Sequence, residues 1–203
     1  VLMILVLIEP DFGGTAILFC LVLIMYSVSG IPTGYILLSI IGITVLVVGG
    51  FSLIVAWNPS FLQDVYVYKR FIAFLHPFKT AANEGAQLVN YAIHNGGLFG
   101  LGLGNSIQKR GYLPEPYTDF ILSIIAEEVG SLGALVVLGL LFYLMILIME
   151  RGVKAQSQYS TFICFGVTAI IFFQTLFNVG AVLGLMPITG VTLPFISYGG
   201  SSL

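Results

Sequence analysis

The stretch Ala134-Leu-Val-Val-Leu-Gly-Leu-Leu-Phe-Tyr-Leu-Met-Ile-Leu-Ile-Met149 contains no charged side chain and lies within a longer apolar run, 119–149. About 20 apolar residues in a helix cross the roughly 30 Å hydrocarbon core of a bilayer. The run therefore predicts a membrane-spanning helix. Three further complete spans and one partial span are predicted in the same way: 13–29, 35–55, 159–186 and, as the partial span, 1–8.

The overall composition agrees with a chain whose solvent is the bilayer. Hydrophobic residues make up 58% of the chain and charged residues 8%, and the mean hydropathy is positive. These values exclude an ordinary soluble globular protein. We therefore expect an all-α fold, a polytopic transmembrane helical bundle, with residues 1–203 forming a single transmembrane domain. Because the chain opens at Val1 inside an apolar stretch and stops at Leu203 after a Gly/Ser cluster, we expect an internal fragment.

Cysteine and histidine usage points to neither disulfides nor a metal site. Cys20 and Cys164 both lie inside apolar runs without a CxxC pair, and the two histidines stand apart without ligand spacing.

The connection between the last two predicted spans decides the topology. It covers only 150–158 and carries Arg151 and Lys154, so the positive-inside rule places it in the cytoplasm. Counting crossings then puts the 29–34 link inside as well. Three segments fall outside: the 9–12 turn, the long 56–118 loop and the 187–203 tail. The bundle is therefore expected to have a long extracytoplasmic loop.

The long outer loop is rich in basic residues and contains a glycine-rich run. Five of the chain's seven basic residues lie in it: Lys69, Arg70, Lys79, Lys109 and Arg110. These charges either solvate the loop or form a surface that binds an anionic headgroup or a pyrophosphate. The glycine run, 96–104, lacks the pattern of a nucleotide-binding loop, so we expect a flexible or closely packed backbone segment.

Asp119 opens the predicted span 119–149, directly after a segment that holds Pro114 and Pro116. Two interpretations stay open. An acid at a helix start caps the first turn or complements the helix dipole. A carboxylate held at the membrane surface near cations could instead deprotonate a hydroxyl.

Glu127 and Glu128 are predicted about 12 Å further along the same helix. A charge at that depth costs at least about 2.5 kcal/mol unless it is paired or faces a polar cavity. Glu127 would lie about 80° around the helix from Asp119 and Glu128 about 180° around it, so only Glu127 is expected to reach the same cavity. A structural hydrogen bond to another helix is the alternative for both acids.

Two further segments are candidates to line a cavity, the 9–15 turn and the 187–202 tail. Both combine Pro, Gly and hydroxyl residues beside apolar spans. Backbone that leaves a helix at membrane depth is tolerated where protein or water surrounds it. Ordinary turn chemistry explains the individual Gly and Pro residues equally well.

Four segments together resemble the SEDS family (shape, elongation, division and sporulation). They are Glu9-Pro-Asp-Phe-Gly-Gly-Thr15, Arg70-Phe-Ile-Ala-Phe-Leu-His-Pro77, the segment 102–121 and Leu193-Pro-Phe-Ile-Ser-Tyr-Gly-Gly-Ser-Ser202. The stretch Gly104-Asn-Ser-Ile-Gln-Lys109 is more similar to the division branch, followed by the sporulation branch, than to the elongation branch. The resemblance implies the C-terminal half of a ten-helix SEDS fold. His76 in place of Asn, and a shorter 87–96 stretch, depart from the family pattern.

The resemblance also implies a function. Members of the family are peptidoglycan glycosyltransferases that polymerise lipid II into glycan strands at the outer face of the bacterial cytoplasmic membrane. The implied partners are lipid II, a class B penicillin-binding transpeptidase and other divisome membrane proteins at the division septum, and no nucleic acid. No cofactor is expected to be required, while a divalent cation is left open. A flippase for the lipid-linked precursor and a non-catalytic scaffold for the transpeptidase remain as alternatives.

Residue roles follow from the same resemblance. Asp119 matches the proposed catalytic aspartate and is expected to act as general base on the acceptor 4-hydroxyl. The expected substrate-binding residues are Arg70, Lys109, Arg110, Glu115 and Ser197, with Asp11, Gln87 and Glu127 in support. No metal ligand is predicted. Small residues of the last span, Gly166, Gly180, Ala181 and Gly184, are expected to form a surface for a partner protein.

Overall fold

The computed structural model describes residues 6, 12–30, 32, 34–35, 37–38, 41–42, 92, 94–107, 117–186 and 188–199. The helices described over their full length are α2 (Phe12–Val28), α7 (Ile121–Glu128), α8 (Gly130–Val153) and α9 (Gln158–Val182). Shorter helical pieces occur at 34–35, 37–38, 41–42 and 94–96. No strand occurs among these residues. The prediction of an all-helical fold is confirmed.

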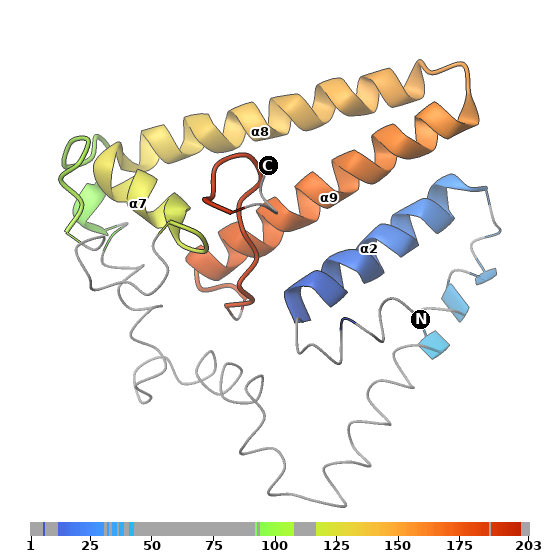
Figure 1. The fold of residues 1–203 in the computed structure, drawn as a ribbon, viewed down its shortest axis with the longest axis horizontal. Coiled ribbons are helices and arrows are strands. Elements are labelled where there is room, and N and C mark those ends of the chain that lie inside the picture. Colours follow the sequence, from blue (N-terminus) through green and yellow to red (C-terminus); the bar gives the residue numbers. More distant parts are fainter. Residues whose placement is uncertain are drawn as a thin grey trace, which may run out of the picture.

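Helices α8 and α9 form the long hairpin at the top of Figure 1. Both are long and apolar enough to cross a membrane, and at about 1.5 Å per residue each extends roughly 36 Å. Many of their large apolar side chains are exposed, including Leu135, Val136 and Leu140 at 63% each. A helix of a soluble protein would turn its apolar side to the core. The exposed apolar surface is that of a membrane-spanning hairpin.

The turn between α8 and α9 is tight. Ser157 caps α9, its hydroxyl accepting from the Ser160 N–H at 3.2 Å. Gly152 allows the two helices to approach, since a methyl group at this position would lie 2.8 Å from Cβ of Cys164. The Thr161 hydroxyl then donates to the Gly152 carbonyl at 3.1 Å.

Helix α2 packs against α9 and runs in the opposite direction (Figure 1). Gly166 of α9 lies at this contact, close to Leu21 and Met25 of α2. Gly180 lies against the Met186 side chain, because a methyl group placed on this glycine would be 3.1 Å from the Met186 sulfur. The prediction that Gly180 faces a partner protein is therefore wrong, because this residue is buried within the chain. Gly166 is half-buried beside α2, and its part in a partner surface stays a prediction.

The predicted span 119–149 is two helices and not one. Helix α7 ends at Glu128 and α8 begins at Gly130, whose φ of +86° is a conformation that residues with a side chain adopt only at a cost. Asp119 precedes α7, so the helical angles expected between Asp119 and Glu127 do not apply. Because α8 alone is long enough to span, Glu127 and Glu128 lie beyond its N-terminal end and not deep within a spanning helix.

The glycine-rich segment closes this helix break with backbone hydrogen bonds. The Leu101 and Gly102 N–H groups donate to the carbonyls of Glu127 and Glu128, each at 2.9 Å. The Ser131 N–H, at the start of α8, donates to a carbonyl of the same segment at 2.9 Å. Helix ends leave such groups without partners, and apolar surroundings offer no water to satisfy them. The interpretation of this run as a closely packed backbone segment is confirmed.

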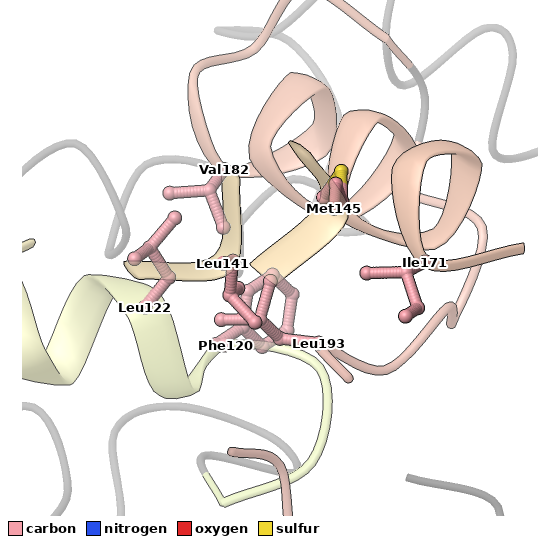
Figure 2. Close-up of a cluster of buried hydrophobic side chains, with 7 residues drawn as sticks. All are labelled: Phe120, Leu122, Leu141, Met145, Ile171, Val182 and Leu193. Carbon is pink, nitrogen blue, oxygen red and sulfur yellow. The ribbon is translucent and has the colours of Figure 1, made fainter. Parts of the chain in front are cut away.

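A hydrophobic cluster joins α7, α8, α9 and the tail (Figure 2). Phe120, at the start of α7, lies beside Leu141 of α8 and Leu193 of the tail. The buried residues of this cluster are Phe120, Leu122, Leu141, Met145, Ile171, Val182 and Leu193. This cluster fixes the position of the turn that carries Asp119.

Candidate functional site

Asp119 lies half-buried in the turn that leads into α7. The N-cap position belongs to Phe120, which makes no side-chain capping hydrogen bond. Asp119 therefore stands one residue before the position that a capping side chain occupies. The buried Phe120 ring holds the adjacent backbone, while the Asp119 side chain remains half-buried at the helix entrance.

Three consecutive carbonyl oxygens around Asp119 accept hydrogen bonds from α9 and the tail. These bonds run from the Tyr198 N–H to Tyr117 O at 2.9 Å, from the Ser197 hydroxyl to Thr118 O at 2.6 Å, and from the Asn178 amide to Asp119 O at 2.9 Å. We call these three bonds the backbone frame of Asp119. They fix the main chain from which the carboxylate projects.

Ser197 belongs to this frame. Its side chain is 6% exposed, and its hydroxyl donates to Thr118 O while accepting from the Leu193 N–H at 2.8 Å. A hydroxyl has one proton to donate, and here that proton is used within the protein. The geometry favours a positioning role for Ser197 over the substrate contact expected from the sequence.

The tail turn that carries Ser197 holds one residue in an unusual conformation. Phe195 has a φ of +63°, in the left-handed region that a residue with a Cβ enters at a cost of about 1–2 kcal/mol. Such conformations persist where surrounding structure fixes them, and they are frequent at functional sites. The hydrogen bonds of Ser197 and Tyr198 to the Asp119 turn provide that support.

Asn178 of α9 connects the frame to the rest of the site. Its amide nitrogen donates to Asp119 O and also to Val191 O at 2.8 Å. Val191 in turn lies against Gly13, where an added methyl group would be 2.5 Å from a Val191 methyl. The start of α2, which holds the described part of the 9–15 segment, therefore contacts the tail at a residue that Asn178 also binds. The cavity that these segments were expected to line stays a prediction.

Sequence reasoning did not identify Asn178. The available signal was that the apolar run 159–186 holds two amides, Gln174 and Asn178, because a polar side chain in a spanning helix needs a specific partner.

Glu127 serves the loop that precedes the site. Its side chain is 0% exposed and accepts a hydrogen bond from the equally buried Ser106 hydroxyl. The Ile107 N–H also donates to it, at 3.4 Å. The sequence offered a structural hydrogen bond from Glu127 to another helix as one alternative. The two bonds described here are structural, but both partners lie in a loop and not in a helix. Glu127 fixes the chain just before 108–116, the segment that leads to Asp119.

The remaining predicted site residues lie outside the described part of the chain. They are Asp11, Arg70, Gln87, Lys109, Arg110 and Glu115. Among the residues that the structure describes, no three His, Cys, Asp or Glu side chains lie close enough together to hold a metal ion.

Comparison with known proteins finds relatives that share one name. The chain is 47% identical over 206 residues to a protein of Lactococcus lactis subsp. lactis (strain IL1403) and 42% identical over 203 residues to one of Bacillus subtilis (strain 168). Both are named probable peptidoglycan glycosyltransferase FtsW. The matches cover 97% and 98% of this chain but 48% and 50% of those proteins, so the chain spans about half their length.

A solved structure is also similar, with a TM-score of 0.76 and 29% identity. The match covers 100% of this chain and 54% of that one, and that work describes structural coordination of polymerization and crosslinking by a peptidoglycan synthase complex. The family described as cell cycle protein, FtsW/RodA/SpoVE, matches residues 1–203. With a helical membrane fold and relatives of this kind along its whole length, the chain belongs to the FtsW/RodA/SpoVE family.

Proposed function

We propose that the full-length protein is a peptidoglycan glycosyltransferase, which polymerises lipid II into glycan strands during cell division. The observation that carries this proposal is the backbone frame that fixes Asp119 at the entrance to α7. A reacting carboxylate needs a defined position, because small displacements of a catalytic group lower the rate strongly. The relatives named FtsW support the reaction class.

In the proposed reaction the Asp119 carboxylate is the general base. It takes the proton from the acceptor sugar's 4-hydroxyl as that oxygen attacks the anomeric carbon of the donor. The bond between the anomeric carbon and the pyrophosphate oxygen breaks, and undecaprenyl pyrophosphate leaves with the bonding electrons. Basic side chains offset the charge that develops on the leaving group. Arg70, Lys109 and Arg110 are our candidates for this role from their place in the sequence.

The sidedness of the site supports polymerisation outside the cell. In Figure 1 the start of α7, the tail and the start of α2 lie toward the open end of the α8–α9 hairpin. The α8–α9 turn, with Arg151 and Lys154, lies at the other end. If this basic turn is cytoplasmic, Asp119 is at the outer surface of the cytoplasmic membrane.

The flippase alternative loses its main support. It relied on Glu127 and Glu128 as coupling acids deep in the membrane, whereas both lie beyond the N-terminal end of α8. Glu127 is moreover committed to Ser106 and Ile107.

We further propose that the protein works with a class B penicillin-binding transpeptidase and other divisome membrane proteins at the septum. The similar structure supports this partnership, since its description joins polymerization with crosslinking in one complex. We propose no required cofactor, and a role for a divalent cation stays open.

The decisive experiment supplies labelled lipid II to the purified full-length protein with its transpeptidase and measures glycan polymer. Asp119→Asn keeps the side-chain volume but cannot accept the proton at neutral pH. We expect it to fold, insert and bind the transpeptidase while losing at least about 10²-fold in polymerisation rate. Polymerisation at the wild-type rate by a well-folded Asp119→Asn protein would refute the assignment of the base. A wild-type complex that makes no polymer would refute the function itself.

A further inference from the structure

We infer that Asn178 is a positioning residue, which sets the place of the Asp119 carboxylate by holding the Asp119 main chain to α9. The inference rests on the proposed function, because it concerns the placement of the proposed base. It is distinct from that function, since polymerisation could occur without any contribution from Asn178.

The first argument is the double donation by one side chain. Asn178 Nδ2 lies 2.9 Å from Asp119 O and 2.8 Å from Val191 O. Both acceptors are backbone carbonyls, so the amide nitrogen must face them, and its two N–H groups match the two oxygens. A hydroxyl, with its single proton, could satisfy only one of them.

The second argument is the state of the other amide atom. Asn178 is 2% exposed, and its Oδ1 has no hydrogen-bond partner among the described residues. A buried acceptor without a partner lowers stability, whereas an apolar side chain of similar shape would avoid that cost. Holding two carbonyls at once is the feature that an apolar residue could not reproduce.

The third argument is the rigidity of the helix that carries Asn178. Residues Ile171, Thr175, Asn178 and Val182 form the buried stripe of α9 at helical spacing. Ile171 and Val182 belong to the hydrophobic cluster in Figure 2, together with Phe120, the residue that follows Asp119. The amide thus connects a packed helix to the turn that carries Asp119.

The test uses the purified full-length protein with its transpeptidase, and it measures kcat and KM for lipid II in the polymerisation assay. Asn178→Ala removes the amide, while Asn178→Asp keeps its size but replaces both N–H donors with an oxygen. We expect each variant to lower kcat by about 10- to 100-fold, because the base is displaced, with KM nearly unchanged. If Ala prevents folding, the nearly isosteric Asp variant still decides.

Thr175→Val is the matched control. Thr175 lies one turn earlier on the same buried stripe, and its hydroxyl donates only to Ile171 O of its own helix, at 2.7 Å. We expect wild-type kcat from this variant. A comparable loss in Thr175→Val would mean that any disturbance of this stripe impairs the enzyme, and it would overturn the inference.

A double-mutant cycle separates positioning from general stability. Asp119→Glu keeps a carboxylate but moves it outward by one methylene, so the base is already displaced. We expect Asn178→Ala to cost much less in this background than in the wild type, because residues that act together are not additive. Equal losses in both backgrounds, or wild-type kcat in both Asn178 variants, would overturn the inference. Neither result would affect the proposed function, which fails only if the wild-type complex makes no polymer.

Discussion

Gly100 and Gly130 lie against each other across the break between α7 and α8. A methyl group placed on either glycine would come within 2.6 Å of the other's backbone nitrogen, and both have positive φ, +79° and +86°. No residue with a side chain fits either position without moving the backbone. This contact lets the glycine-rich segment approach closely enough to pair with the ends of both helices.

Gly100→Ala should therefore destabilise the protein severely. The methyl group would also meet the Glu128 carbonyl carbon at 2.5 Å, and we expect a loss of at least about 3 kcal/mol from the clash and the strained φ. Gly104→Ala is the matched control, because Gly104 has a similar φ of +84° but nothing within 4 Å of the added methyl. It should cost only about 1–2 kcal/mol. Thermal unfolding in detergent measures both, and equal midpoints would contradict the close packing.

Glu127 should matter as an acceptor for the 106–107 loop. Glu127→Leu leaves the buried Ser106 hydroxyl and the Ile107 N–H without this partner, at about 1–3 kcal/mol for each unsatisfied group. Glu127→Gln keeps one carbonyl oxygen and should be milder. Hydrogen exchange at Ile107 and the thermal midpoint report the loss. A Leu variant as stable and as protected as the Gln variant would show that these bonds contribute nothing.

Ser197→Ala distinguishes a positioning role from a substrate contact. Loss of a substrate contact raises KM, whereas loss of the bond to Thr118 should displace Asp119 and lower kcat. We expect kcat to fall by up to about 10²-fold with KM unchanged. Ser27→Ala serves as control, since that hydroxyl is exposed and bonds only Leu23 O of its own helix. A rise in KM alone would restore the substrate-binding role.

The membrane orientation can be tested by thiol labelling after Cys20 and Cys164 are replaced by alanine. Leu103 and Tyr198 are 82% and 80% exposed, and hydrogen bonds of Gly102 and Tyr198 hold their segments to α7 and to the Asp119 turn. Lys154 lies at the other end of α8. Cysteines at 103 and 198 should react with an impermeant reagent added outside intact cells, and one at 154 only after permeabilisation. The reverse pattern would invert the topology.

The sequence predicted those helices whose ends follow from hydropathy and length. The expected spans 13–29 and 159–186 correspond to Phe12–Val28 and Gln158–Val182, and most of the predicted span 35–55 lies outside the described residues. The break at Gly130 was not predicted, because a single glycine in an apolar run does not by itself end a helix. The hydrogen bonds that make the break stable come from Leu101 and Gly102, far earlier in the chain, and no local pattern reveals them.

For the site, the sequence identified Asp119 through its motif and not through its chemistry. A single carboxylate before a helix is as consistent with capping as with catalysis. Ser197 was identified as well, but for a substrate contact that its buried hydrogen bonds do not favour. Asn178 was missed because its partners are backbone oxygens, which carry no residue-specific signal in a sequence.

The backbone frame of Asp119 also sets an order for biosynthesis. Its side-chain donors, Asn178 and Ser197, follow the carbonyls they bind by 59 and 79 positions along the chain. Translation proceeds from the N-terminus, so the ribosome completes the Asp119 turn long before either donor exists. The hairpin of α8 and α9 must insert, and the tail must fold back, before the carboxylate is held in place. A nascent or prematurely terminated chain thus carries Asp119 without the hydrogen bonds that hold its main chain in place.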